Sequence, residues 1–204
     1  MSDRTSHWEK VYTTKAEDEV SWFQENPMTS LRLIQDAGAS PDSRIIDIGG
    51  GASRLVDALQ EQGFRAVTVL DISASALETA KTRLGAAGAK VEWIVADVTT
   101  WTPAKSYDIW HDRAAFHFLT ELADRDAYID RLRSVVGPGG QVIIGTFALD
   151  GPEKCSGLPV QRYDSRSLAE VLGPAFELAD DRAEAHRTPW GSIQHFQFSR
   201  FRRV

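Results

Sequence analysis

Cysteine is almost absent from this chain of 204 residues, which contains only Cys155. A single thiol cannot form an internal disulfide, so the sequence excludes the disulfide framework of a small secreted protein. Long apolar runs are also missing, and none approaches the ~18 residues that a membrane-spanning helix needs. The opening segment, MSDRTSHWEK, lacks the apolar core of a signal peptide. We therefore expect a cytoplasmic protein that has no membrane partner.

Positive charge is in slight deficit, since 23 Lys and Arg face 29 Asp and Glu, for a net charge of −6. A small acidic excess argues against nucleic acid as the main partner. The one local basic run, at Arg200, Arg202 and Arg203, reads as a solvated strand edge. The five histidines and Cys155 match no metal-ligand spacing, so no metal is predicted. The length suits one domain spanning residues 1–204.

Short apolar runs alternate with longer amphipathic stretches, a pattern typical of strands and helices in a parallel sheet. The first forty residues look helical, with a helix start at Asn26-Pro27. We expect strands at 44–48, 66–70, 91–96, 107–110 and 141–147, and helices at 53–62, 73–84, 124–136 and 165–172. The tail, 176–187 and 193–202, reads as two strands with no helix between them, which predicts an antiparallel hairpin. The fold class is a doubly wound α/β sheet.

A glycine cluster follows the first expected strand and precedes a helix, with Gly49 and Gly51 at its turn. Small residues at this position let the backbone approach a ligand closely, at the sheet edge where α/β proteins bind ligands. The dinucleotide fingerprint requires a third glycine where this chain has Arg54, which disfavours a nicotinamide or flavin site. No Gly-Lys-Ser/Thr follows either, so a phosphate-binding P-loop is excluded.

Three acidic residues end, or nearly end, successive strands: Asp47, Asp71 and Asp97. Asp71 lies twenty residues after Gly51, the distance at which an acid on the neighbouring strand accepts hydrogen bonds from ribose hydroxyls. Asp97 is suited to the amino group of an adenine, with Val98 behind the ring. Together the three acids predict an acidic cleft, which suits a ligand with ammonium and sulfonium charges and would repel a pyrophosphate.

These segments resemble the ordered motifs of class I S-adenosylmethionine-dependent methyltransferases: DIGGGAS, LDIS, ADV and the Gly-Pro-Gly-Gly turn at 137–140. The resemblance covers about residues 45–147 and implies a Rossmann-like sheet of seven strands, the last inserted antiparallel. It also implies S-adenosyl-L-methionine as cofactor. The contacts it implies are Asp47, Gly49 and Gly51 at the methionine end, Asp71 and Ile72 at the ribose, and Asp97 and Val98 at the adenine. Ser53 departs from the pattern, since many members have a third glycine there.

The end of the fourth expected strand faces the reactive end of such a ligand and carries His111, Asp112 and Arg113. The run Asp-Arg-Ala-Ala at 112–115 is similar to a segment of thiopurine and thiol methyltransferases. That resemblance implies that residues 1–40 form a helical lid whose aromatic residues bind the cofactor: Trp8, Tyr12 and Trp22. We interpret His111 as a base or orienting group that also borders the cofactor, with Asp112 and Arg113 as its supports.

A sulfonium is already an activated methyl donor, so catalysis needs mainly alignment and water exclusion. A thiol with a pKa near ~8.5 needs little help from a base. We therefore expect methyl transfer to a small-molecule nucleophile, with a thiol favoured. Two alternatives stay open. The runs HWEKVY and VSWF are loosely similar to small protein lysine methyltransferases, and a non-catalytic S-adenosylmethionine-binding module would contain the same motifs.

Overall fold

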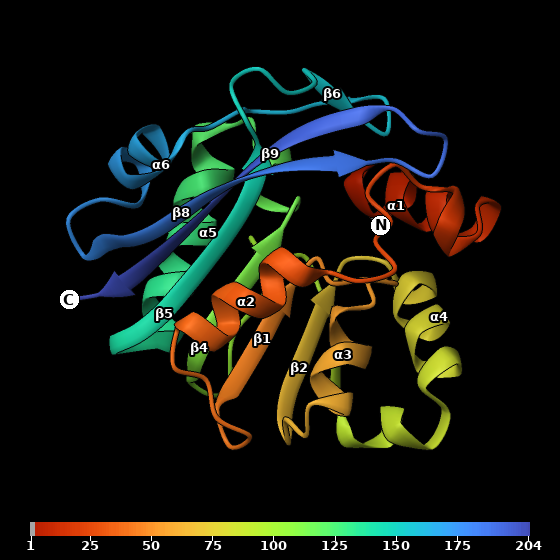
Figure 1. Ribbon diagram of the computed structural model, residues 1–204, viewed down its shortest axis with the longest axis horizontal. Coiled ribbons are helices and arrows are strands. Elements are labelled where there is room, and N and C mark those ends of the chain that lie inside the picture. Colours follow the sequence, from red (N-terminus) through yellow and green to blue (C-terminus); the bar gives the residue numbers. More distant parts are fainter. Residues whose placement is uncertain (1–2) are drawn as a thin grey trace.

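Five buried apolar runs form the parallel part of a central sheet in the computed structural model, which describes residues 3–204 (Figure 1). They are β1 (Arg44–Ile48), β2 (Ala66–Asp71), β3 (Glu92–Val95), β4 (Tyr107–Arg113) and β5 (Val136–Phe147). Strands β1 and β2 are buried on both faces, as expected of parallel strands that helices cover on both sides. All five therefore place their carboxyl ends along one edge of the sheet.

The chain ends in the predicted hairpin of β8 (Phe176–Arg187) and β9 (Ile193–Arg203), shown in blue in Figure 1. The strand order is β3-β2-β1-β4-β5-β9-β8, and β9 pairs antiparallel with both β5 and β8. The connection between β8 and β9 is too short for a crossover helix, so the pair must be antiparallel. The structure confirms the seven-stranded sheet with its inserted antiparallel strand. Edge strand β8 is rich in charged residues, which discourages pairing with another chain.

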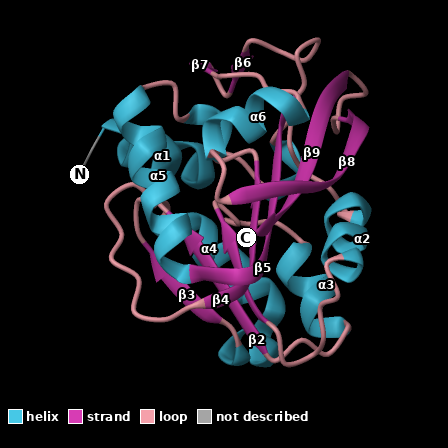
Figure 2. Ribbon diagram, turned by 90° about the vertical axis from the view of Figure 1, so that its left-hand side faces the viewer, coloured by secondary structure: helices cyan, strands magenta, loops and turns pink. Residues whose placement is uncertain are grey.

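Helices cover both faces of the sheet and form two apolar cores (Figure 2). One face carries α2 (Met28–Asp36), α3 (Leu55–Glu61) and α4 (Ala74–Leu84), and the other carries α5 (Leu122–Val135) and α6 (Ser165–Leu172). Ser73 begins α4 as predicted, because its Oγ accepts a hydrogen bond from the Ala76 amide at 3.1 Å. Asp164 caps α6 in the same way through the Ser167 amide.

The N-terminal helix α1 (Asp3–Thr14) lies beyond the carboxyl ends of β1 and β2, next to α4 (Figure 1). Glu9 fixes it there, since its carboxylate accepts hydrogen bonds from the Ala74 and Ser75 amides at the start of α4. Short elements complete the chain: η1 (Glu17–Glu19), η2 (Gly85–Lys90), η3 (Phe116–Phe118), β6 (Lys154–Cys155) and β7 (Leu158–Pro159). The expected helical segment 1–40 thus consists of α1, η1 and α2, and its residues 1–2 lie outside the described part.

Three expected boundaries are wrong. Strand β4 continues three residues beyond 110 to Arg113, because 111–113 still pair with β5. Helix α5 begins at Leu122 rather than at 124, with Glu121 as its N-cap. The Gly-Pro-Gly-Gly segment is no separate break, because β5 begins at Val136 and contains it. A shift in the β4–β5 register between Tyr107 and Ile109 accommodates this segment.

Candidate functional site

A cavity opens at the carboxyl edge of the sheet, between the ends of β1, β2 and β4 and helix α1. A second, smaller cavity adjoins it, and both are lined by Tyr12, Trp22, Gly49 and Arg113. We call these the large and the small cavity. The large cavity also touches five other residues that the sequence predicted: Trp8, Asp71, Ile72, Asp97 and Val98.

The glycine turn after β1 packs closely against neighbouring segments and leaves no room for side chains. Gly49 has φ +64°, and a Cβ there would lie 2.6 Å from the Cβ of Ala115 in the loop after β4. Gly51 has φ +45°, and a Cβ there would lie 3.0 Å from both a carboxylate oxygen of Asp71 and the hydroxyl of Tyr12. The glycines therefore let three segments meet at the cavity: the β1 turn, the end of β2 and helix α1.

Asp71 ends β2 and lies on the wall of the large cavity with 5% of its surface exposed. Its Oδ1 accepts a hydrogen bond from the Ser73 amide at 2.8 Å. The pKa of Asp71 is raised to about 7, mainly by burial and to a smaller extent by the nearby carboxylates of Asp47 and Glu9. The group is thus a strong acceptor whose charge is only partly compensated by the protein.

Asp97 follows β3, and its two carboxylate oxygens have different partners. Oδ1 accepts hydrogen bonds from the amide and hydroxyl of Thr99, which orient the carboxylate. Oδ2 lies 3.3 Å from Nη1 of Arg4, whose Nη2 also pairs with Asp124. Arg4 and Arg113 both line the large cavity, so the expectation of a uniformly acidic cleft is wrong.

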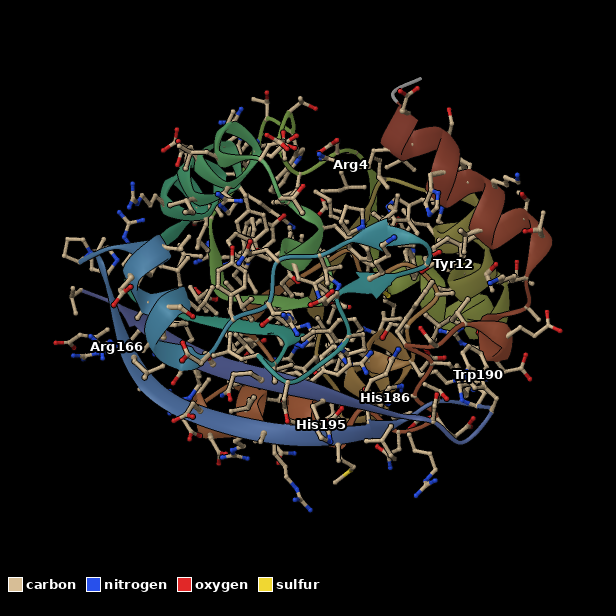
Figure 3. The ribbon with its side chains drawn as sticks, turned by 90° about the horizontal axis from the view of Figure 1, so that it is seen from above. Arg4, Tyr12, Arg166, His186, Trp190 and His195 are labelled. Carbon is tan, nitrogen blue, oxygen red and sulfur yellow. The ribbon has the colours of Figure 1, made fainter. Side chains whose placement is uncertain are left out.

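Aromatic rings line the end of the large cavity next to α1. Trp8 packs against Trp22 and Phe118 with ring centroids 5.7 and 4.9 Å apart, both in edge-to-face geometry. Tyr12 lies next to Trp22 at 6.3 Å. In Figure 3, Arg4 and Tyr12 lie on the side of α1 that faces the rest of the molecule. The structure therefore brings the three predicted N-terminal aromatic residues together with Phe118, which the sequence analysis did not find.

His111 occupies the middle of a buried hydrogen-bond chain. Its Nδ1 lies 2.7 Å from Oδ1 of Asp47, and its Nε2 lies 2.9 Å from Oγ of Ser30 in α2. Only 2% of the His111 surface and 3% of the Asp47 surface is exposed. Both residues border the small cavity and not the large one. Both ring nitrogens of His111 are thus already engaged within the protein.

Asp112 faces the opposite side of the sheet, because neighbouring side chains of a strand alternate. It is fully buried and accepts hydrogen bonds from the Ala115 and Phe116 amides and from the Tyr128 hydroxyl. Burial raises the pKa of Asp112 to about 6. The carboxylate lines neither cavity. These hydrogen bonds hold the loop after β4 against α5.

Arg113 is the one residue of the β4 end that lines both cavities. Its Nη1 donates to the carbonyl of Trp22 at 2.8 Å, and its guanidinium stacks over the ring of Phe196 at 4.7 Å. Glu184 of β8 lies 3.9 Å from Nη2. Burial lowers the pKa of Arg113 to about 10, so the group stays protonated near neutral pH.

Cys155 is buried and lines the large cavity. Burial raises the pKa of Cys155 to about 11. Burial also lowers the pKa of His117 to about 3, and Nδ1 of His117 accepts a hydrogen bond from the Phe147 amide. Near neutral pH both the thiol and this imidazole are therefore uncharged.

The sequence and the fold are both similar to those of known methyltransferases. Residues 45–140 match the family model described as "Methyltransferase domain", and this range contains the glycine turn, Asp71, Asp97 and the end of β4. The fold matches that of N-methyltransferase NodS from Bradyrhizobium japonicum, solved with S-adenosyl-L-homocysteine, with a TM-score of 0.75. That match has 18% identity and covers 98% of this chain and 99% of the other.

Residues 45–140 are thus similar to a methyltransferase domain, and the chain has the fold of solved methyltransferases.

Among curated relatives, EEF1A lysine methyltransferase 2 from Danio rerio is 28% identical over 165 residues, which cover 77% of this chain and 65% of the relative. Ubiquinone biosynthesis O-methyltransferase from Serratia proteamaculans is 27% identical over 124 residues, covering 60% of this chain and 50% of the relative. The chain thus spans about half to two thirds of the length of these relatives.

Several residues of the site were not found by the sequence analysis: Arg4 and Phe118, which line the large cavity, and Ser30, which bonds His111. A signal for Arg4 was present, because Arg4, Trp8 and Tyr12 are spaced four residues apart and so share one helix face. Ser30 carried no comparable signal, since its partner His111 is 81 residues away.

Within residues 3–204, no three His, Cys, Asp or Glu side chains gather in a way that would hold a metal ion. None of the helices that the structure describes is long and apolar enough to cross a membrane.

Proposed function

We propose that the protein binds S-adenosyl-L-methionine in the large cavity and transfers its methyl group to a small-molecule nucleophile, with a thiol as the favoured acceptor. One observation carries the proposal. The same cavity is lined both by the carboxylates of Asp71 and Asp97 and by the rings of Trp8, Trp22 and Phe118. A nucleoside and an apolar acceptor can therefore lie side by side, shielded from water.

The residues present fit the cofactor. Asp71 has spare acceptor capacity for the ribose hydroxyls, since the amides of Ser73 and Gly51 bond its side chain and a carboxylate can accept about four hydrogen bonds. Asp97 and Val98 would hold the adenine, with Ile72 along the ribose. The methionine end would point toward the glycine turn and the small cavity, where Gly49 and the buried Asp47 lie. When bound, the cofactor supplies an electrophilic methyl group on a sulfonium.

The acceptor end of the cavity holds no group suited to act as a strong base. The ionisable side chains beside Trp22 and Phe118 are Tyr12, Arg113 and Cys155, and burial keeps the Tyr12 hydroxyl and the Cys155 thiol protonated by raising the pKa of each. An acceptor that ionises by itself near neutral pH fits such a site, whereas an amine or alcohol would need a base. This supports a thiol or a comparably acidic nucleophile. His111 stays our candidate orienting group, acting through Asp47.

We further propose that residues 1–204 form one methyltransferase domain in which 1–40 act as a lid. Helix α1 contributes Arg4, Trp8 and Tyr12 to the cavity wall. Trp8 packs on Trp22 and Phe118, and the helix is otherwise attached by polar, local contacts, through the ion pairs of Arg4 and the hydrogen bonds of Glu9 to α4. Such contacts can open and close at modest cost, which suits cofactor exchange.

A protein lysine acceptor is the second candidate, because EEF1A lysine methyltransferase 2 aligns over 77% of this chain. The two are separated by incubating the protein with methyl-labelled S-adenosylmethionine and a bacterial lysate, then dividing the products by size. Label in the small-molecule fraction, increased by added thiols, supports the proposal. Label confined to a protein band favours the lysine acceptor.

Asp71→Ala is the control that must lose labelling. Asp42→Ala, on the exposed turn before β1, should keep it. Equal labelling by the wild type and Asp71→Ala would contradict the cofactor assignment.

A further inference from the structure

We infer that Arg113 is the anion-binding group of the acceptor end, so that the methyl acceptor is a small, partly apolar molecule bearing a negatively charged group. This inference rests on the proposed function. It names the class of substrate that the same cavity selects.

The first observation is the incomplete pairing of the Arg113 guanidinium. Nη1 donates to the Trp22 carbonyl, but Nε and Nη2 are buried without a hydrogen-bond partner. The nearest acid, Glu184, lies 3.9 Å from Nη2, beyond hydrogen-bond distance, and it already accepts a hydrogen bond from Gln24 at 2.8 Å. A buried cation with two unused donors is costly, and an anionic ligand would remove that cost.

The second observation is the charge of the surroundings. Three titratable groups near Arg113 are uncharged around pH 7, since burial lowers the pKa of His117 and His186 and raises that of Cys155. The carboxylates that act on the guanidinium are Glu184 and, from the small cavity, Asp47, which is already bonded to His111. The guanidinium lies beside the rings of Trp22 and Phe118, which fit an apolar body.

The third observation concerns the competing ligand, the methionine carboxylate of the cofactor. The small cavity, toward which that carboxylate would point, is lined by Arg54, which pairs with Glu17 and Glu25, as well as by Arg113. Arg113 instead packs on Phe196 of β9 and faces Glu184 of β8, on the hairpin side of the site. The geometry thus assigns Arg113 to the acceptor and leaves Arg54 nearer to the cofactor.

The test measures binding of two matched probes, phenylacetate and its neutral amide phenylacetamide, to the protein saturated with S-adenosylhomocysteine. We expect the wild type to prefer phenylacetate by about tenfold, as a charge-assisted pair predicts. Arg113→Gln should abolish the preference while S-adenosylhomocysteine affinity stays within about twofold. Arg166→Gln should change neither, because Arg166 lies on α6, far from Arg4 and Tyr12 in Figure 3, with 88% of its side chain exposed.

Glu184→Gln provides an independent arm that leaves Arg113 in place. Removing the competing carboxylate should strengthen phenylacetate binding several-fold and leave phenylacetamide binding unchanged. A purely structural Arg113–Glu184 pair would not alter the probe preference, and that result overturns the inference.

Two other results overturn it as well: equal binding of both probes by the wild type, or a large loss of S-adenosylhomocysteine affinity in Arg113→Gln. Failure of the wild type to bind S-adenosylhomocysteine would instead contradict the proposed function. The probe pair would then be measured on the free protein, so the two proposals fail separately.

Discussion

Replacing Asp71 by Asn should make the free protein more stable at pH 8 while weakening its binding of S-adenosylhomocysteine. The substitution keeps the shape of the side chain, and an amide oxygen still accepts the hydrogen bond of the Ser73 amide. What disappears is a buried charge, which lies near the carboxylates of Asp47 and Glu9. The protein therefore keeps an unfavourable carboxylate at this position. The proposed hydrogen bonds from the ribose hydroxyls of the cofactor would account for it.

The magnitude follows from the pKa of Asp71, which rises from 3.8 in the unfolded chain to about 7 in the fold. Because the folded pKa is raised, the folded state binds the proton more tightly between these two values. This group therefore lowers the free energy of unfolding as the pH rises from 4 to 7. Each pKa unit corresponds to about 1.36 kcal/mol, so the full penalty above pH 7 is at most about 4 kcal/mol.

Urea unfolding of the wild type and Asp71→Asn at pH 5 and pH 8 tests this directly. The variant should gain roughly two to three times as much free energy of unfolding at pH 8 as at pH 5. In calorimetry at pH 8 it should bind S-adenosylhomocysteine roughly ten- to hundredfold more weakly, since the ribose loses a charged acceptor. Asp108→Asn is the opposite control, because Arg44 lowers the pKa of Asp108 and its removal should not stabilise the fold. A stability gain in Asp71→Asn that is equal at both pH values would refute the reasoning.

Two further substitutions test the walls of the site. Gly49→Ala should unfold at a lower urea concentration than Gly38→Ala, and it should lose S-adenosylhomocysteine binding in calorimetry. Both positions have positive φ, but only at Gly49 would a Cβ meet Ala115, at 2.6 Å. Equal losses of stability in the two variants would argue against a close approach of Gly49 to Ala115. Ser30→Ala leaves a buried nitrogen of His111 unpaired and should cost about 1–3 kcal/mol of unfolding free energy in urea. Unchanged stability of that variant would show that the hydrogen bond contributes nothing.

Local pattern was enough to predict the sheet and several of the residues that line the large cavity. Parallel strands align their carboxyl ends, so acids that follow successive strands must meet at one edge, as Asp71 and Asp97 do at the large cavity. The boundaries at the start of α5 and the end of β4 were wrong because pairing with neighbouring elements, not local sequence, decides where a strand or helix stops.

The sequence by itself determined which elements form and in what order, because periodicity, glycines and strand ends act over a few residues. Only the tertiary structure decided what each polar side chain at the β4 end does. Alternation along that strand directs Asp112 into the core and Arg113 into the cavity, and contacts formed across 81 and 91 residues join His111 to Ser30 and Arg113 to Trp22. Burial and partners set the chemistry of these groups, and both arise from segments that the chain brings together only when it folds.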